Sequence, residues 1–493
     1  MKGFVLMNNQ KSLLHISKNA FLSVFVILLV LVVASGILTH LIPAGSYDYS
    51  DNGSIIENSY RTLPDVPGYP IWKWFLAPFM VFGGSDAINI IAISIFLLIL
   101  GGTFTIMDKT GGIHVIIKKL ILRYQNRKYV LLRLVILVFM LFGAFFGIFE
   151  ESMALLPIMI LLSLSLGWDT LVGVGMCLLA AGFGFASAIT NPFSVGIATE
   201  LARTISGENI NLLSGVFFRL FVFAIMYLLL STFLVRYAKK VETNPERSPM
   251  FEEDKKKARD FDLSKSLPFE NENLIFKSFT IMFVVLLGFV VLASILDLVA
   301  EISVPTIPLM ALTFLIGGIT SGFIVTKDAK KTWTFFANGA LGVAPAILLI
   351  LLAASVKHII TEAQIMDTIL HTIATALSDK SPIVGVLIIY ALVLFLQFFI
   401  GSASAKAFLI MPLLVPLAGL IGITNQLAIL AFIFGDGYTN VIFPTNGVLL
   451  IGLSIASVGY AKWFKWTAVL QLITLVLTTL LLILAYYTGY GTW

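Results

Sequence analysis

Apolar segments of about 20 residues recur along this chain, and each is long enough to cross a lipid bilayer as a helix. Of the 493 residues, 58% are hydrophobic and only 12% are charged, with a mean hydropathy of +0.98. Soluble domains carry about 25% charged residues, so polar side chains are too few here to cover a soluble surface. Barrel strands are roughly 10-residue segments of alternating polarity, which these are not. The sequence therefore predicts an all-α integral membrane protein.

The charges predict how the chain is oriented in the bilayer. The net charge of +5, from 32 Lys and Arg against 27 Asp and Glu, is too small to indicate a nucleic-acid partner. Basic residues instead mark cytoplasmic ends of spans. Lys11 and Lys18 place the N-terminus in the cytoplasm, and the charged stretch 252–259 places the linker 238–273 there too. The C-terminus is then expected outside.

The first half, residues 1–237, contains two interrupted apolar stretches. The stretch 131–166 is too long for one span, and the letters FGIFEES at 146–152 put two adjacent carboxylates in its middle, where lipid cannot surround them. We expect a re-entrant hairpin with its tip there. The stretch 170–202 is broken at Thr190-Asn-Pro192, because proline removes a backbone donor. This pattern predicts a discontinuous helix.

The second half, residues 274–493, repeats this order. A hairpin is expected over 382–420, interrupted by GSASAK at 401–406, and a broken helix over 426–460, interrupted by PTNG at 444–447. One offset of 255 residues aligns the two halves, since it pairs Pro157 with Pro412, Gly167 with Gly422, Gly182 with Gly437, Thr190 with Thr445 and Asn191 with Asn446. The loop charges make the two repeats inverted.

Inverted repeats with hairpins and broken helices are typical of secondary transporters that bind substrate near the bilayer midplane. A helix that stops in mid-membrane leaves backbone N–H or C=O groups without water, and these groups are available to an ion or a polar substrate. The Thr-Asn pair at each break adds hard oxygen ligands. This pattern favours a transport site built around both breaks.

Five charged residues lie in apolar surroundings. Glu150 and Glu151 repel each other and lose hydration, so they predict a bound amine, a coupling cation or a proton. Lys406 occupies the position equivalent to Glu151; it either binds a substrate carboxylate or neutralises Glu151. Asp436, between two glycines, is a candidate cation or proton site. Arg219 lies inside a span and is expected to pair with an acid.

The sequence offers no support for an enzyme. It has no GxxxxGK phosphate-binding loop, no HExxH sequence and no cysteine cluster, and its five histidines are scattered. We therefore expect no cofactor and no metal apart from a coupling Na⁺; the alternative coupling ion is H⁺. The lone Cys177 lies in an apolar run and predicts a packing residue.

Four stretches together resemble a known family: FEESMA at 149–154, AITNPFS at 188–194, GSASAKAF at 401–408 and FGDGYTN through PTN at 434–446. They are similar to the YfcC branch of the C4-dicarboxylate anaerobic carrier family, in the ion transporter superfamily. The resemblance implies a secondary transporter of the bacterial inner membrane, a homodimer with a scaffold and a moving part, and an elevator-like displacement. It also implies substrate and ion contacts from Glu150, Glu151, Ser152, Thr190, Asn191, Ser402, Ser404, Thr445 and Asn446.

The substrate stays open at this point. Family members are described as carrying dicarboxylates or as exchanging arginine and ornithine. A dicarboxylate beside Glu150, Glu151 and Asp436 would need more compensation than Lys406 alone, whereas an amino acid brings its own ammonium. We therefore predict an amino acid, with a carboxylate coupled to Na⁺ or H⁺ as the alternative and an ion channel as the second alternative. The candidate coupling-ion residues are Glu150, Asn191, Asp436, Asn440 and Asn446.

Overall fold

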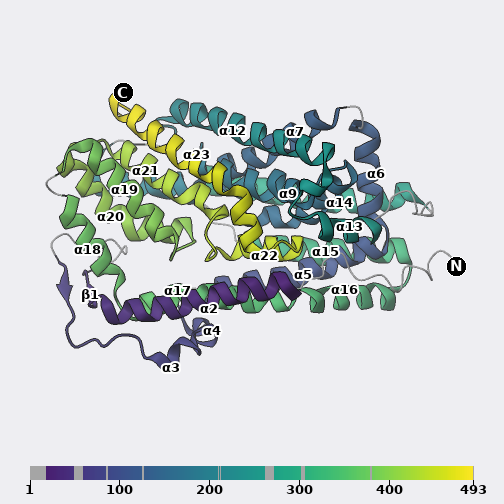
Figure 1. Ribbon diagram of the computed structural model, residues 1–493, viewed down its shortest axis with the longest axis horizontal. Helices are drawn as coiled ribbons and strands as arrows, with labels where there is room; N and C mark the ends of the chain where they lie inside the picture. Colours follow the sequence, from purple (N-terminus) through teal and green to yellow (C-terminus); the bar gives the residue numbers. More distant parts are fainter. Residues whose placement is uncertain are drawn as a thin grey trace.

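The computed structural model describes residues 18–48, 59–84, 87–124, 127–208, 210, 212–260, 271–300, 306–377 and 380–491. Nearly all of these residues are helical (Figure 1). In this part of the chain, six helices are long and apolar enough to cross a membrane, or seven if the bent pair Ala329–Val343 and Ile347–Glu362 forms one span. The predicted class, an all-α membrane protein, is confirmed.

Two short strands break the helical pattern near the start of the chain. The elements here are α2 (Lys18–Leu41), β1 (Gly45–Ser46), β2 (Arg61–Thr62), α3 (Ile71–Trp74), α4 (Ala77–Met80) and η2 (Val81–Gly83). The strands pair antiparallel, with Gly45 opposite Thr62. The sequence analysis did not predict these strands, because two-residue strands carry no periodic signal.

The rest of the first half consists of long helices at its two ends and short helical segments between them. It comprises α5 (Ala87–Lys109), α6 (Gly112–Tyr124), α7 (Lys128–Leu141), η4 (Phe142–Phe146), η5 (Glu150–Ala154), α8 (Leu156–Ser165), α9 (Thr170–Val174), η6 (Gly175–Leu179), α10 (Ala180–Ser187), η7 (Pro192–Gly196), α11 (Ile197–Ser206) and α12 (Val216–Thr243). The helix is interrupted at 147–149 and at 188–191, close to both predicted positions.

The linker and the second half contain the remaining helices. These are η8 (Pro245–Arg247), α13 (Phe251–Asp260), α14 (Glu272–Ala300), α15 (Thr306–Thr326), α16 (Ala329–Val343), α17 (Pro345–Glu362), α18 (Met366–Leu377), α19 (Pro382–Gln397), α20 (Ala403–Ile421), α21 (Asn425–Gly437), η9 (Tyr438–Val441), α22 (Gly447–Ala456) and α23 (Tyr460–Tyr487). The second half is interrupted at 398–402 and at 442–446. Helix α16 was not expected, because its first turn is rich in lysine; Asp328 caps it.

Helix starts in the two repeats are separated by the offset found in the sequence. Helix α9 begins at Thr170 and α21 at Asn425, and 425 minus 170 is 255. Helices η7 and α22 begin at 192 and 447, again 255 apart. The glycines paired by the same offset, Gly167 and Gly422, both have positive φ, with values of 84° and 70°. The offset therefore relates the backbone conformations of the two halves as well as their amino-acid sequences.

The helices form two groups that lie side by side (Figure 1). In one group, α17 packs against α2, and α5 packs against α15 and α16. In the other, α10 packs against α21, α11 against α20, and α22 against α8. All three contacts cross between the repeats, because α8, α10 and α11 belong to the first half and α20, α21 and α22 to the second.

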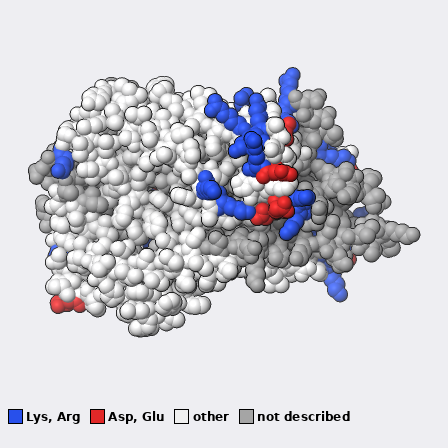
Figure 2. Space-filling view, viewed as in Figure 1, with Lys and Arg blue, Asp and Glu red and all other residues white. Residues whose placement is uncertain are grey.

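Charged side chains gather at one end of the molecule. Figure 2 shows Lys and Arg clustered where α12 and α13 lie, and few charged side chains at the opposite end among the described residues. Arg236, Lys239 and Lys240 are exposed there, on the last turns of α12. Helices α2 and α23 run in the same sense: each finishes nearer to the end of the molecule that carries β1 than it starts.

The two broken helices touch through small residues. A Cβ built on Gly437 would lie 2.1 Å from Cα of Ala186, and one on Gly182 would lie 2.7 Å from a methyl group of Val441. Close backbone approach of this kind is what small residues permit between membrane helices. The contact holds α10 and α21 in a fixed mutual position just beside both breaks.

We expect Gly437→Ala to lower the thermal unfolding midpoint in detergent, since the methyl group must displace backbone; overpacking of this kind costs about 1–3 kcal/mol. The matched control is Gly419→Ala, in α20, where an added Cβ meets nothing within 4 Å. That variant should match or exceed the wild-type midpoint. Equal midpoints for the two variants would contradict the close packing of α10 on α21.

Candidate functional site

A buried ion pair lies beside the second break. Nζ of Lys406, on α20, is 2.6 Å from Oδ1 of Asp436, on α21, and both side chains have an exposed fraction of 0%. Two charges removed from water are tolerated only when they compensate each other. Lys406 and Asp436 therefore form one neutral unit that joins the two helices.

A chain of side-chain amides extends this pair to the break itself. Lys406 also donates to Oε1 of Gln397, and Nε2 of Gln397 donates to Oδ1 of Asn440 at 2.7 Å. Nδ2 of Asn446 donates to the same Asn440 oxygen at 3.0 Å. The Asn440 amide group donates to the backbone carbonyls of Asp436 and Gly437, at 3.1 and 3.0 Å. All five side chains of the network are buried.

Asn446 has a second role as the cap of α22. Its Oδ1 accepts a hydrogen bond from the backbone N–H of Leu449 at 3.0 Å, which satisfies one of the donors left free at a helix start. Thr445, half-buried, precedes it in the break. The residue type predicted from the sequence is thus used twice, as a helix cap and as a donor in the network.

The first break is held mainly by backbone groups. Oδ1 of Asn191 accepts from the N–H groups of Phe193 and Ser194, at 2.9 and 3.3 Å, and so caps η7. Its Nδ2 donates to the Gly143 carbonyl at 3.4 Å. The N–H of Thr190 donates to the Ala144 carbonyl at 3.1 Å. The first broken helix is therefore fastened to η4, beside the first hairpin's interruption.

The other predicted residues lie at the two hairpin interruptions. Glu150 starts η5 and is half-buried; Ser152 is buried in η5, where its carbonyl accepts from Sγ of Cys177 at 3.2 Å. The side chain of Glu151 lies outside the described residues. In the second half, the exposed Ser402 caps α20 and its hydroxyl is 3.3 Å from that of Ser404. Cys177 is a packing residue, as expected.

Packing brings the two breaks towards each other. Segment η5 contacts α22, the helix that Asn446 caps, and η7 contacts both α20 and α21, which carry Lys406 and Asp436. The hydrogen-bonded network described above is nevertheless built from second-half residues: Gln397, Lys406, Asp436, Asn440 and Asn446. The first half contributes a second capped helix start beside it.

One partner was not foreseen and one expectation needs correction. Among the described residues, the acidic partner of Lys406 is Asp436, which lies on the adjacent helix. Arg219 was expected to pair with an acid, but its guanidinium donates to the carbonyls of Ile189 and Ser214, at 3.2 and 3.0 Å, and of Leu212. Backbone carbonyls left unpaired beside a helix break need donors just as an acid does.

Gln397 is the network residue that sequence reasoning missed. A single glutamine at the end of an apolar helix carries no charge and belongs to none of the stretches that repeat. The available signal was its position, since it is the last residue of α19 and directly precedes the second hairpin's interruption. Its partners come from α20 and η9.

The network can serve a polar ligand as well as the fold. Among the described residues, Oδ2 of Asp436 is buried without a hydrogen-bond partner, and so are the hydroxyls of Ser152 and Ser194. Carboxylate, amide and hydroxyl oxygens are the ligands that hard cations prefer. A cation at Asp436 would, however, compete with the Lys406 ammonium for the same carboxylate.

We expect Lys406→Met and Asp436→Leu each to destabilise the protein strongly, because breaking a buried pair leaves one charge uncompensated at a cost of about 3–5 kcal/mol. The double variant should regain most of that loss, and Lys465→Met, at an exposed lysine, should cost little. The measurement is the thermal unfolding midpoint in detergent. Simple addition of the two single effects in the double variant would show that the pair contributes nothing.

Comparison with known proteins places this chain in a family. The family model described as C4-dicarboxylate anaerobic carrier matches residues 21–487. The chain is 28% identical to YfcC of Escherichia coli K12 over 501 residues, covering 94% of this chain and 96% of that protein, whose description gives basic amino acid antiport as a proposed role. It is 27% identical over 392 residues to a Haemophilus influenzae protein described as uncharacterized, covering 78% and 73% of the two chains.

Two solved transporter structures also align with the chain. The YdaH transporter of Alcanivorax borkumensis aligns at 17% identity and a TM-score of 0.43, over 96% of this chain and 98% of that one. The antimetabolite efflux pump MtrF of Neisseria gonorrhoeae aligns at 15% identity and a TM-score of 0.42, over 97% and 96%. Because the family model spans nearly the whole chain, this membrane protein belongs to the C4-dicarboxylate anaerobic carrier family of transporters.

Proposed function

We propose that this transporter exchanges amino acids, cationic ones included, across the bacterial inner membrane. The observation that carries the proposal is the 2.6 Å pair between Lys406 and Asp436. Because that pair is neutral, Lys406 does not supply a positive charge to a dicarboxylate. Glu150 and Glu151, at the first hairpin's interruption, then favour the ammonium group of a substrate. The description of the Escherichia coli relative agrees with this preference.

The carboxylate of such a substrate has candidate partners at the helix starts. Helix α22 begins at the break beside Asn446, and η7 continues into α11 from the break beside Asn191. The N-terminal ends of helices carry partial positive charge and favour anions. The hydroxyls of Ser152, Ser402 and Ser404 and the Thr190 and Thr445 side chains are candidate polar contacts around these ends.

For the transport cycle we favour an elevator-type alternating-access movement in a homodimer. Support comes from the separation into two packing groups, one around α2, α5, α16 and α17 and one around the hairpins and broken helices. We assign the end of the molecule that carries Arg236, Lys239 and Lys240 to the cytoplasm, because positive charge accumulates on that side of membrane proteins. Either H⁺ or Na⁺ could couple transport through Glu150, Asn191, Asp436, Asn440 or Asn446.

A second candidate is a carboxylate carrier coupled to Na⁺ or H⁺, which the description of the matching family model favours. It requires Glu150, Glu151 and Asp436 to be neutralised by protons or bound cations when a dicarboxylate enters. The two candidates differ in the sign of the substrate's charge, so one transport assay separates them.

In proteoliposomes preloaded with unlabelled arginine, we expect labelled arginine to accumulate by counterflow and excess lysine or ornithine to reduce it. Excess succinate should leave the uptake unchanged, because it lacks the ammonium that the acids recognise. Protein-free liposomes provide the background. Counterflow with succinate but not with arginine would replace the first candidate with the second.

Asn446→Ala should lower counterflow at least about tenfold, since it removes both the α22 cap and the donor to Asn440. Asn446→Asp keeps an acceptor for the Leu449 N–H but loses the donor, so a difference between the variants separates the two roles. Asn191→Ala tests the equivalent cap in the first half. Full activity in both alanine variants, at equal reconstitution, would exclude these asparagines from the transport site.

A further inference from the structure

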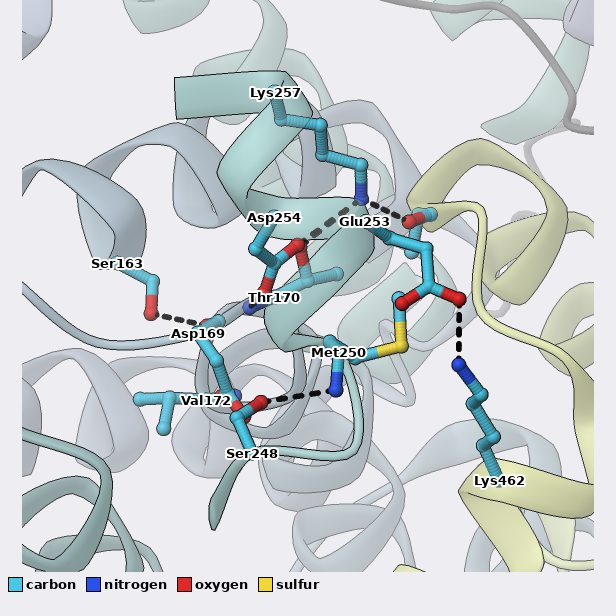
Figure 3. Close-up of polar contacts among 11 residues, drawn as sticks. Ser163, Asp169, Thr170, Val172, Ser248, Met250, Glu253, Asp254, Lys257 and Lys462 are labelled. Carbon is cyan, nitrogen blue, oxygen red and sulfur yellow. Dashed lines mark hydrogen bonds and ion pairs between the residues drawn. The ribbon is translucent and has the colours of Figure 1, made fainter. Parts of the chain in front are cut away.

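Helix α13 of the linker is docked on the membrane helices rather than left in solvent. Figure 3 shows Glu253, Asp254 and Lys257 of this helix turned towards Thr170 of the first repeat and Lys462 of the second. Asp254 is buried, although it belongs to a stretch of ten residues of which eight are charged and which the sequence alone indicates to be a hydrophilic linker. Helix α13 therefore makes specific contacts and does more than connect the two halves of the chain.

One end of the contact is the start of the first broken helix. Oδ2 of Asp254 accepts from the N–H of Thr170 at 2.8 Å, and Oδ1 accepts from its hydroxyl at 2.5 Å. Asp169 caps the same helix by accepting from the N–H of Val172 at 2.9 Å, and is itself held by Ser248. Two carboxylates thus face the N-terminus of α9, where partial positive charge favours them.

The other end of the contact is the finish of the second broken helix. Nζ of Lys257 donates to the carbonyl of Ala456, the last residue of α22, at 2.6 Å, and to the Thr170 hydroxyl at 3.0 Å. A cation at a helix C-terminus is favoured in the same way as an acid at the N-terminus. Beside it, Lys462 of α23 pairs with Glu253 at 2.6 Å.

Desolvation makes the charges on α13 depend on each other. Burial raises the pKa of Asp254 and lowers the pKa of Lys257. Their side chains lie 3.6 Å apart, one turn from each other on α13. Removing either one leaves the other less compensated at the junction of α9 and α22.

The two helices held in this way lead directly to the candidate site. Helix α22 begins after its cap, Asn446, and runs from Gly447 to Ala456, a length of about 15 Å for ten residues. It packs against the first broken helix on the way, since a Cβ on Gly452 would lie 2.2 Å from a methyl group of Leu178. A route from the site to the α13 end of the molecule that passes between η6 and α22 is therefore closed while the ends of α9 and α22 stay together.

We propose that Glu253, Asp254 and Lys257 form a latch that keeps α9 and α22 together and releases them when the site opens towards the α13 end. These are positioning residues: they touch helix ends, not substrate. The inference rests on the proposed transport function, but its first test does not need a substrate. The opposing possibility is that α13 moves as one rigid block with both helices and never detaches.

The native Cys177 reports on the seam between the helices. It is fully buried, directly precedes Leu178 in the chain, and donates to η5, which packs against α22. We expect Lys257→Met and Asp254→Ala to raise the rate of Cys177 labelling by N-ethylmaleimide about tenfold, the factor that corresponds to about 1.4 kcal/mol. Lys256→Met, at an exposed lysine of the same helix, is the matched control and should label like the wild type.

General unfolding would also expose Cys177, so the unfolding midpoint is measured for each variant. Faster labelling with an unchanged midpoint supports local release. Unchanged labelling in both variants would overturn the latch, whatever the substrate proves to be.

A cross-link tests the need for release. In a Cys177→Ser background, Glu253→Cys with Lys462→Cys places thiols where side chains 41% and 44% exposed now pair. Joining them with a cleavable bifunctional thiol reagent should abolish counterflow, measured with whichever of arginine and succinate the wild type exchanges. Reduction of the reagent should restore it. Each single-cysteine variant, treated alike, should remain active. Full counterflow in the cross-linked protein would show that α13 moves rigidly with these helices.

Discussion

Two helices stop inside an apolar body, and the backbone groups left at those stops must be satisfied without bulk water. Asn191 and Asn446 meet this requirement in the same way, each accepting N–H bonds from the helix that begins after it. The caps fix where η7 and α22 begin, and these helices in turn contact the hairpin segments of the opposite half. The fold around the breaks thus follows from one constraint on unpaired backbone donors.

The repeats meet the same constraint with different chemistry. At the first break, the carbonyls of Gly143, Ala144 and Phe145 accept bonds from Thr190 and Asn191, so backbone groups of the first hairpin segment hold the broken helix. At the second break, a network of side chains from Asn446 to Asp436 serves this purpose. The acceptors at the first break are backbone carbonyls, so only Thr190 and Asn191 contribute side chains there, whereas every member of the second network contributes its side chain.

Sequence alone predicted the membrane class and the four interruptions, because both depend on local rules: the length of apolar runs, proline within an apolar run and polar residues within lipid-length segments. It singled out Asn191 and Asn446 as oxygen ligands, and their role as helix caps came from the structure. It did not predict the partner of Lys406. The offset of 255 placed Glu151 opposite that lysine in the alignment, but a long side chain pairs with what packs beside it, and α21 packs beside α20. The role of Gln397, the carbonyl partners of Arg219 and the contacts of α13 were missed for the same reason, since tertiary packing determines them.

The distribution of charge follows from this packing and bears on what the site can recognise. A lysine buried without a partner would be the natural anchor for an anion, but pairing with Asp436 makes Lys406 part of the scaffold of the second repeat. The remaining attraction for an anion comes from partial charges at helix starts, which are weaker than a full charge and fall off within one turn. Glu150 carries a full charge when ionised. Capped helix starts occur in both halves, at Asn191 and at Asn446, whereas Glu150 belongs to the first half alone. This combination of shared backbone caps and unshared charges underlies the proposed preference for a zwitterion over a dianion.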